Sequence, residues 1–169
     1  MANEIINRVA QSKLITIDLE DFYPEGERIL LDISEWLYEG LILREKDFRE
    51  LAAKHNWSQY KNKYVALTCT TDAIIPSWAY LLITTYISPF VNKVVVGSLE
   101  LLETTIFQQI IENIDITDYL DKPIIVKGCS TKPIPETASV HLVEKLLPVA
   151  KTILFGEACS SVPLYRKKK

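Results

Sequence analysis

The chain has 169 residues, of which 48% are hydrophobic and 24% are charged, and its formal net charge is −3. A chain of this length can bury a core, so we expect one soluble domain over residues 1–169. Its content of only five glycines and eight prolines excludes collagen-like and low-complexity proteins. The acidic balance argues against a general nucleic-acid binder. Three cysteines, an odd number, exclude a full disulfide framework, and no apolar leader is visible, so we expect a cytoplasmic protein.

The first sixty residues are expected to form an N-terminal extension of mixed strands and helices. In chain order, the pattern first predicts a strand over Leu14–Leu19, a turn at Tyr23–Gly26 and a strand over Arg28–Ile33. It then predicts a short helix capped by Asp32 or Ser34 and ending at Gly40, a strand over Leu41–Leu43 and a helix over Glu45–His55. We expect residues 1–60 to pack on the sheet of the second half or to continue it.

The second half, residues 64–165, alternates short aliphatic runs with helical patterns. The predicted strands are Tyr64–Thr68, Lys93–Val96, Pro123–Lys127 and Thr152–Phe155, and the predicted helices are Pro76–Ile87, Leu99–Asn113 and Pro135–Leu147. Strand and helix alternating in this way favour right-handed parallel crossovers. We therefore predict an α/β fold, a three-layer sandwich with a mainly parallel sheet in residues 64–156.

One long segment lacks charged residues. Residues Ala73–Asn92 contain none, a length that raises the question of a membrane-spanning helix. Pro76 and Pro89 leave only about a dozen helical positions between them, which is too few to span a bilayer. A helix buried on most sides explains the segment better, and no membrane partner is expected.

Each cysteine follows a predicted strand. Cys69, Cys129 and Cys159 each begin a triplet whose other two residues are serine or threonine. The carboxyl ends of parallel strands meet at one edge of a sheet, and ligands bind there in open α/β sheets. The pattern therefore predicts that the three thiols share one site.

Three thiolates at one site are typical of a soft metal ion or cluster, because thiolates bind zinc, copper(I) and iron–sulfur clusters. A tetrahedral centre with three cysteines needs a fourth ligand or keeps an open position. We predict an iron–sulfur cluster or a zinc ion as cofactor. The predicted ligands are Cys69, Cys129 and Cys159, and the candidate fourth ligands are Asp72, Glu157 and Glu103.

Two alternatives remain open on these residues. Free cysteine is among the most buried residue types, so the protein is alternatively an interaction or structural module without a cofactor. A thiol-dependent redox protein would instead use a nearby pair, such as Cys129 with Cys159, to form a reversible disulfide. No catalytic residue is predicted, and whether the protein is an enzyme stays undecided.

Two other groups of residues are weaker candidates. Asp18, Glu20 and Asp21 form an acidic cluster after the first predicted strand, and turn capping explains them at least as well as acid–base chemistry. His55 is expected to be a solvated residue at a helix C-terminus, where a cation is favourable.

Several segments together resemble one bacterial family. LEDFYPEGER, EGLILREKDFRE, DAIIPSWAY, KGCSTKP and FGEACSSVPLY are similar, in this order, to the domain of unknown function 2480. The resemblance covers essentially the whole chain and implies no established activity. It implies a link to iron–sulfur assembly proteins as candidate partners, because family members are often encoded near iron–sulfur assembly genes. A second copy of the chain is the other candidate partner.

Overall fold

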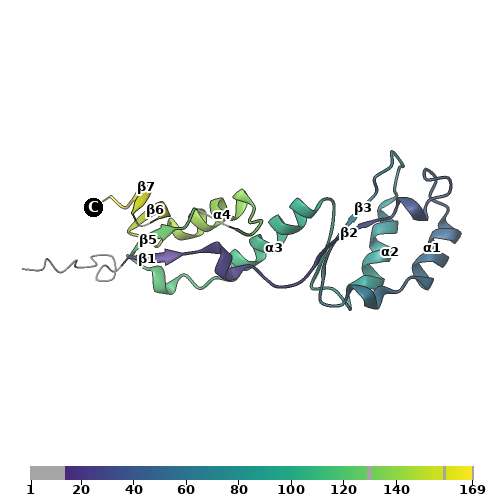
Figure 1. The fold of residues 1–169 in the computed structure, drawn as a ribbon, viewed down its shortest axis with the longest axis horizontal. Coiled ribbons are helices and arrows are strands. Elements are labelled where there is room, and N and C mark those ends of the chain that lie inside the picture. Colours follow the sequence, from purple (N-terminus) through teal and green to yellow (C-terminus); the bar gives the residue numbers. More distant parts are fainter. Residues whose placement is uncertain (1–13, 129–130, 158, 169) are drawn as a thin grey trace, which may run out of the picture. The chain divides into compact units, whose positions relative to one another are not determined.

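The computed structural model describes residues 14–128, 131–157 and 159–168, and the chain divides into two compact units. Unit 2 is Pro24–Ile106, and unit 1 combines the described residues on either side of it (Figure 1). Each unit has its own cluster of buried apolar residues. The single domain expected for residues 1–169 stays a prediction.

Unit 2 is built on a three-stranded parallel sheet in the order β2-β3-β4. Its strands are β2 (Arg28–Asp32), β3 (Tyr64–Thr68) and β4 (Lys93–Val96), and its complete helices are α1 (Glu45–Lys54) and α2 (Ser77–Ile87). A helical crossover joins each strand to the next, as parallel pairing requires. The two helices lie side by side (Figure 1).

The core of unit 2 lies between its sheet and this helix pair. Side chains alternate along a strand, so Val65 and Leu67 of β3 point to the same face, and both are fully buried. Phe48 of α1 and Ile83 of α2 belong to the same cluster and are fully buried too. Burial of this apolar surface is the main force that holds the layers together.

The opposite face of the unit 2 sheet is covered in part. Ala66 points away from α1 and α2, yet it is fully buried. Arg28 alternates with the core residue Ile29 and donates from Nε to Glu103 Oε1 at 2.6 Å. Glu103 lies in the first part of α3 (Leu99–Asn113), so helices contact this sheet from both sides.

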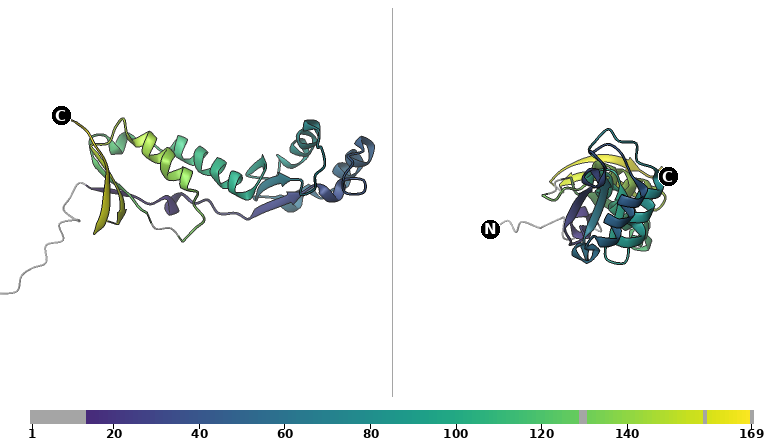
Figure 2. Two further views of the ribbon diagram at one scale, coloured as in Figure 1. Left: turned by 90° about the horizontal axis from the view of Figure 1, so that it is seen from above. Right: turned by 90° about the vertical axis from the view of Figure 1, so that its right-hand side faces the viewer.

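Unit 1 contains a four-stranded sheet in the order β1-β5-β6-β7. Its elements are β1 (Ile15–Ile17), β5 (Pro123–Val126), β6 (Thr152–Glu157), β7 (Ser160–Arg166), the end of α3, and α4 (Glu136–Leu146). β1, β5 and β6 are parallel, whereas β7 folds back antiparallel on β6 as a hairpin, drawn in yellow in Figure 2. Turns of 3-10 helix connect the elements of both units: Leu19–Phe22, Ser34–Trp36, Trp57–Tyr60 and Thr117–Tyr119.

The two units repeat the same order of elements at an interval of 59 residues, as from Pro76 to Pro135. These two prolines precede α2 and α4 and accept equivalent hydrogen bonds, from Ala79 N at 3.0 Å and from Ala138 N at 2.9 Å. The equivalent core positions are buried in both units: Phe48 and Phe107, Ala52 and Ile111, Val65 and Ile124, Leu67 and Val126, Ala79 and Ala138, Ile83 and Leu142, Ile87 and Leu146. One layered arrangement is therefore built twice.

The predicted α/β class and the mainly parallel strands are confirmed, and both N-terminal strands continue a sheet. The strands of residues 64–156 are divided between two sheets, because β1 occupies the edge of β5 that β4 would need for one continuous sheet. The predicted strand at Leu41–Leu43 is wrong. Glu39 and Gly40, with φ of 50° and 71°, make a tight turn there, and only a single bridge joins Tyr38 to Ile42.

The uncharged segment forms α2 between its two prolines, as predicted. None of the helices in the described part of the chain has the length and apolar content needed to cross a membrane. The helix is buried on one face, however, and not on most sides, because Leu81 is 65% exposed whereas Ile83 is fully buried.

We predict that Ile83→Ala lowers the free energy of unfolding by about 2 to 5 kcal/mol, because it leaves a cavity in the unit 2 core. Leu81→Ala removes a similar side chain from the exposed face of the same helix, and its expected cost is below about 1 kcal/mol. Urea unfolding followed by circular dichroism measures both. Equal losses of unfolding free energy for the two variants would show that Ile83 does not face the core of unit 2.

Candidate functional site

The carboxyl edge of the unit 1 sheet brings two opposite charges together. Ile17 and Val126, the last residues of β1 and β5, are paired, so Asp18 and Lys127 leave the sheet side by side. The backbone N–H of Lys127 donates to the Ile17 carbonyl at 2.9 Å, and Lys127 Nζ lies 2.6 Å from Asp18 Oδ2. The position of both side chains therefore follows from strand register.

Asp18 has a second role in the local backbone. Its Oδ1 accepts a hydrogen bond from Glu20 N at 2.9 Å and so caps the short helix after β1. Turn capping, one of the two explanations expected for this acidic cluster, is thus observed for Asp18, and the ion pair is an addition to it. The hydrogen bond to Asp18, and then the charge of Asp18, raise the pKa of Lys127, so this side chain is an ammonium at neutral pH.

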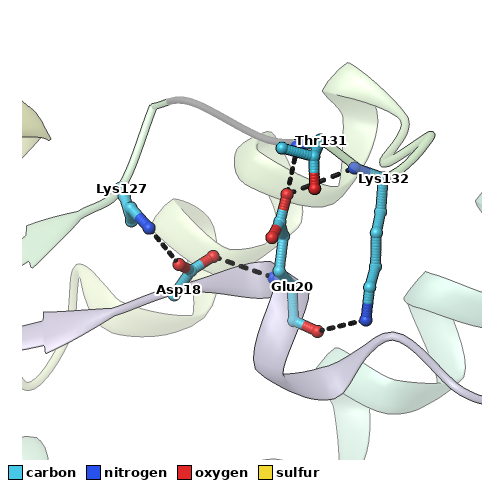
Figure 3. A network of polar contacts seen from close by, with 5 residues as sticks. All are labelled: Asp18, Glu20, Lys127, Thr131 and Lys132. Carbon is cyan, nitrogen blue, oxygen red and sulfur yellow. Dashed lines mark hydrogen bonds and ion pairs between the residues drawn. The ribbon is translucent and has the colours of Figure 1, made fainter.

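Glu20 holds the far end of the loop that follows β5. Its Oε1 accepts hydrogen bonds from the backbone N–H groups of Thr131 and, at 3.2 Å, Lys132. Lys132 Nζ donates back to the Glu20 carbonyl at 3.5 Å (Figure 3). Asp18 and Glu20 therefore secure the two described ends of one loop, at Lys127 and at Thr131.

A pocket of about 350 Å³ lies beside this network, within unit 1. Its lining combines donors with an apolar wall and comprises Asp18, Leu19, Lys127, Gly128, Ile134, Pro135, Glu136, Ser139 and Phe155. The first turn of α4 begins in this lining, where Ala138 N donates to the Pro135 carbonyl and the N–H groups of Glu136 and Thr137 come before the helix's own hydrogen-bond ladder. A Cβ added to Gly128 would come within 3.0 Å of the Phe155 ring, so the glycine permits the close approach of β5 to β6.

The equivalent edge of unit 2 is arranged differently. Asp32 is the last residue of β2, whereas Asp18 comes directly after β1, and Asp32 accepts hydrogen bonds from Ser34 N at 2.9 Å and from Thr70 Oγ1 at 2.5 Å. Burial opposes ionisation of Asp32, but the hydrogen bonds from Thr70 and Ser34 outweigh it and hold the pKa of Asp32 below its usual value. Tyr80 stands where unit 1 has Ser139, so a large side chain replaces a small one.

The predicted cysteine site is placed only in part. Cys69 follows β3 in unit 2, is partly buried, and lies 3.4 Å from Thr71 Oγ1 through its Sγ. Cys159 is exposed in the turn between β6 and β7 in unit 1. Cys129 lies outside the described residues. The three-cysteine metal site therefore stays a prediction.

The candidate fourth ligands have separate surroundings. Asp72 is exposed in the loop after Cys69, and Glu157 is the last residue of β6. Glu103 is 8% exposed and engaged by Arg28, as described above. Within residues 14–128, 131–157 and 159–168, no group of three or more histidine, cysteine or acidic side chains is arranged to hold a metal ion.

Comparison with known proteins places the chain in a family. A profile described as "Protein of unknown function (DUF2480)" matches residues 3–167. The chain belongs to the DUF2480 family. This confirms the resemblance seen in the sequence, and the family description assigns no activity. No curated protein and no solved structure was found to match the chain.

Sequence reasoning missed the main polar residue of this DUF2480 pocket. Lys127 was predicted only as the end of a strand. The available signal was the aspartate near the carboxyl end of each N-terminal strand segment, in ITID and LLD. The expectation that His55 is solvated is also corrected. His55 is partly buried, and its ring lies 4.6 Å from that of Trp57 and 5.6 Å from that of Tyr60. Burial lowers the pKa of His55, which favours the neutral form.

We predict that Thr70→Val costs about 1 kcal/mol of stability at pH 7, because it removes a hydrogen bond to a carboxylate. The lowered pKa of Asp32 means that this stabilisation is present above the unfolded-state value of about 3.9 and is lost as the pH falls through the folded-state value. The difference from wild type should therefore shrink below about pH 4.

Thr85→Val is the matched control, because Thr85 Oγ1 donates to the neutral Leu82 carbonyl at 2.7 Å. Its effect on unfolding in urea should not change between pH 3 and pH 7. A Thr70→Val effect that stays constant over this range would contradict the role given to Asp32.

Proposed function

We propose that the protein binds a small organic anion in the pocket at the carboxyl edge of the unit 1 sheet. The observation that carries this proposal is the position of Lys127, an ammonium that lines a pocket with an apolar wall. Asp18 orients Lys127 and leaves it 34% exposed. An ammonium has three N–H donors, and Asp18 takes one, so donors remain for a ligand.

Two further groups of the lining favour the same ligand class, whereas the acidic side chain of Glu136, which also lines the pocket, opposes it. The Ser139 hydroxyl can donate, and the first turn of α4 offers backbone N–H groups at the positive end of the helix dipole. Leu19, Ile134 and Phe155 supply apolar surface for the body of a ligand. The volume, about 350 Å³, lies at the lower end of the range for small-molecule sites.

Three probes of equal size and different charge test this proposal: benzoate, benzyl alcohol and benzylamine. Ligand-observed NMR should show benzoate binding about tenfold more tightly than the other two, because Lys127 pairs with its carboxylate. Lys127→Met should remove this preference. Lys46→Met, which removes one exposed cation from α1, should leave it unchanged.

Ser139→Tyr gives a second test that does not depend on charge. Unit 2 carries Tyr80 at the equivalent position, so a tyrosine is compatible with this layered arrangement. In unit 1 it should fill the pocket and abolish binding of benzoate, while circular dichroism stays unchanged. Benzylamine binding more tightly than benzoate, or benzoate binding that survives both variants, would overturn the proposal.

A second candidate function is metal or iron–sulfur binding through cysteine thiolates. It is supported by exposure, because Cys159 is exposed and Cys69 is only partly buried. Cys159 is therefore not the buried residue that the cofactor-free packing alternative expects, whereas Cys69 packs against the buried cluster of unit 2. The association of the family with iron–sulfur assembly genes is the other support. It points to candidate partner proteins and does not identify any metal ligand.

Elemental analysis of anaerobically purified protein measures this second candidate directly. We expect stoichiometric iron or zinc in the wild type and its loss when Cys69, Cys129 and Cys159 are all replaced by serine. Benzoate binding should persist in that triple variant, which separates the two functions. Protein that holds no iron, zinc or copper before or after reconstitution would exclude the metal site.

A further inference from the structure

A group of basic side chains lies at the amino edge of the unit 1 sheet, opposite to the edge with the pocket. Lys151 precedes β6, Arg166 ends β7, and Lys167 and Lys168 follow it. These four side chains line a hollow of about 360 Å³. The sequence indicated only a short basic tail, because Lys151 comes to it from a distant part of the chain.

Strand register fixes this arrangement. Lys167 N donates to the Lys151 carbonyl at 2.9 Å, and Lys151 N donates to the Lys122 carbonyl at 2.9 Å. Lysines therefore stand on three adjacent chain segments, which neighbouring strands hold about 4.8 Å apart. Like charges placed across adjacent strands repel one another and destabilise the sheet.

Few acidic side chains among the described residues pair with these cations. Within the described part of the chain, Lys167 is the member of this group that forms an ion pair, and its Nζ lies 3.7 Å from Asp121 Oδ1. Lys151, Arg166 and Lys168 are exposed. A multivalent anion in the hollow would contact several cations at once and relieve their repulsion.

We infer that this basic hollow, lined by Lys151, Arg166, Lys167 and Lys168, binds a compact polyphosphate group of a small molecule. Concavity favours a compact ligand, because a flat lipid surface would contact only the rim of the hollow. Charge favours it too. The whole chain has a net charge of −3, so the residues outside these four cations carry −7, which disfavours a long nucleic acid that extends beyond the hollow.

Isothermal titration calorimetry with inorganic tripolyphosphate tests the inference on the full chain. We expect tripolyphosphate to bind more tightly than orthophosphate, because it offers more charges to the same four cations. The double variant Lys151→Gln, Lys168→Gln should weaken tripolyphosphate binding by about tenfold. The control Lys46→Gln, Lys54→Gln removes the same charge from exposed positions of α1 and should have little effect.

Two further probes distinguish the sources of phosphate. A twelve-nucleotide single strand and vesicles containing phosphatidylserine should each bind more weakly than tripolyphosphate. Tighter binding of either one would overturn the compact ligand in favour of a nucleic acid or a membrane. Equal loss of affinity in the two double variants would show that net charge, and not this hollow, determines binding.

Discussion

The parallel pairing of β1 with β5 is the constraint on which unit 1 depends. Ile17 pairs with Val126, and all of unit 2 lies between them in the chain. This pairing covers one edge of β5 and sets Asp18 beside Lys127. Closing so long a stretch of chain costs conformational entropy, which the buried apolar residues of unit 1 must offset.

Helices and strands with clear periodicity could be predicted from the sequence, and the division into two sheets could not. The strands at Tyr64–Thr68 and Lys93–Val96 form where aliphatic runs predict them. Sequence pattern does not show which strands are neighbours, however, because β4 and β5 both look like central strands. β7 was missed because Pro163 and a run of exposed residues are unusual for a strand interior, although an edge strand tolerates both.

The candidate pocket shows the same limit at the level of single residues. The placement of functional groups at the carboxyl edge of parallel strands was predictable, but the choice of groups was not. Asp18 and Lys127 are 109 residues apart, and each has an ordinary local explanation as a cap or a strand end. Comparison of the two units supplies what local reasoning lacked. Thr68 and Tyr80 stand where unit 1 has Lys127 and Ser139, so one layered arrangement carries two different edges.

The interleaved order of the units also has a consequence for synthesis. β1 leaves the ribosome first, but its partner β5 follows only after the whole of Pro24–Ile106. β1 therefore stays without its partner until β5 has been made. An unpaired strand is a hazard for aggregation, which short strands and neighbouring charges reduce. β1 has only three residues and is followed by Asp18, Glu20 and Asp21, so it has both of the features that reduce this hazard.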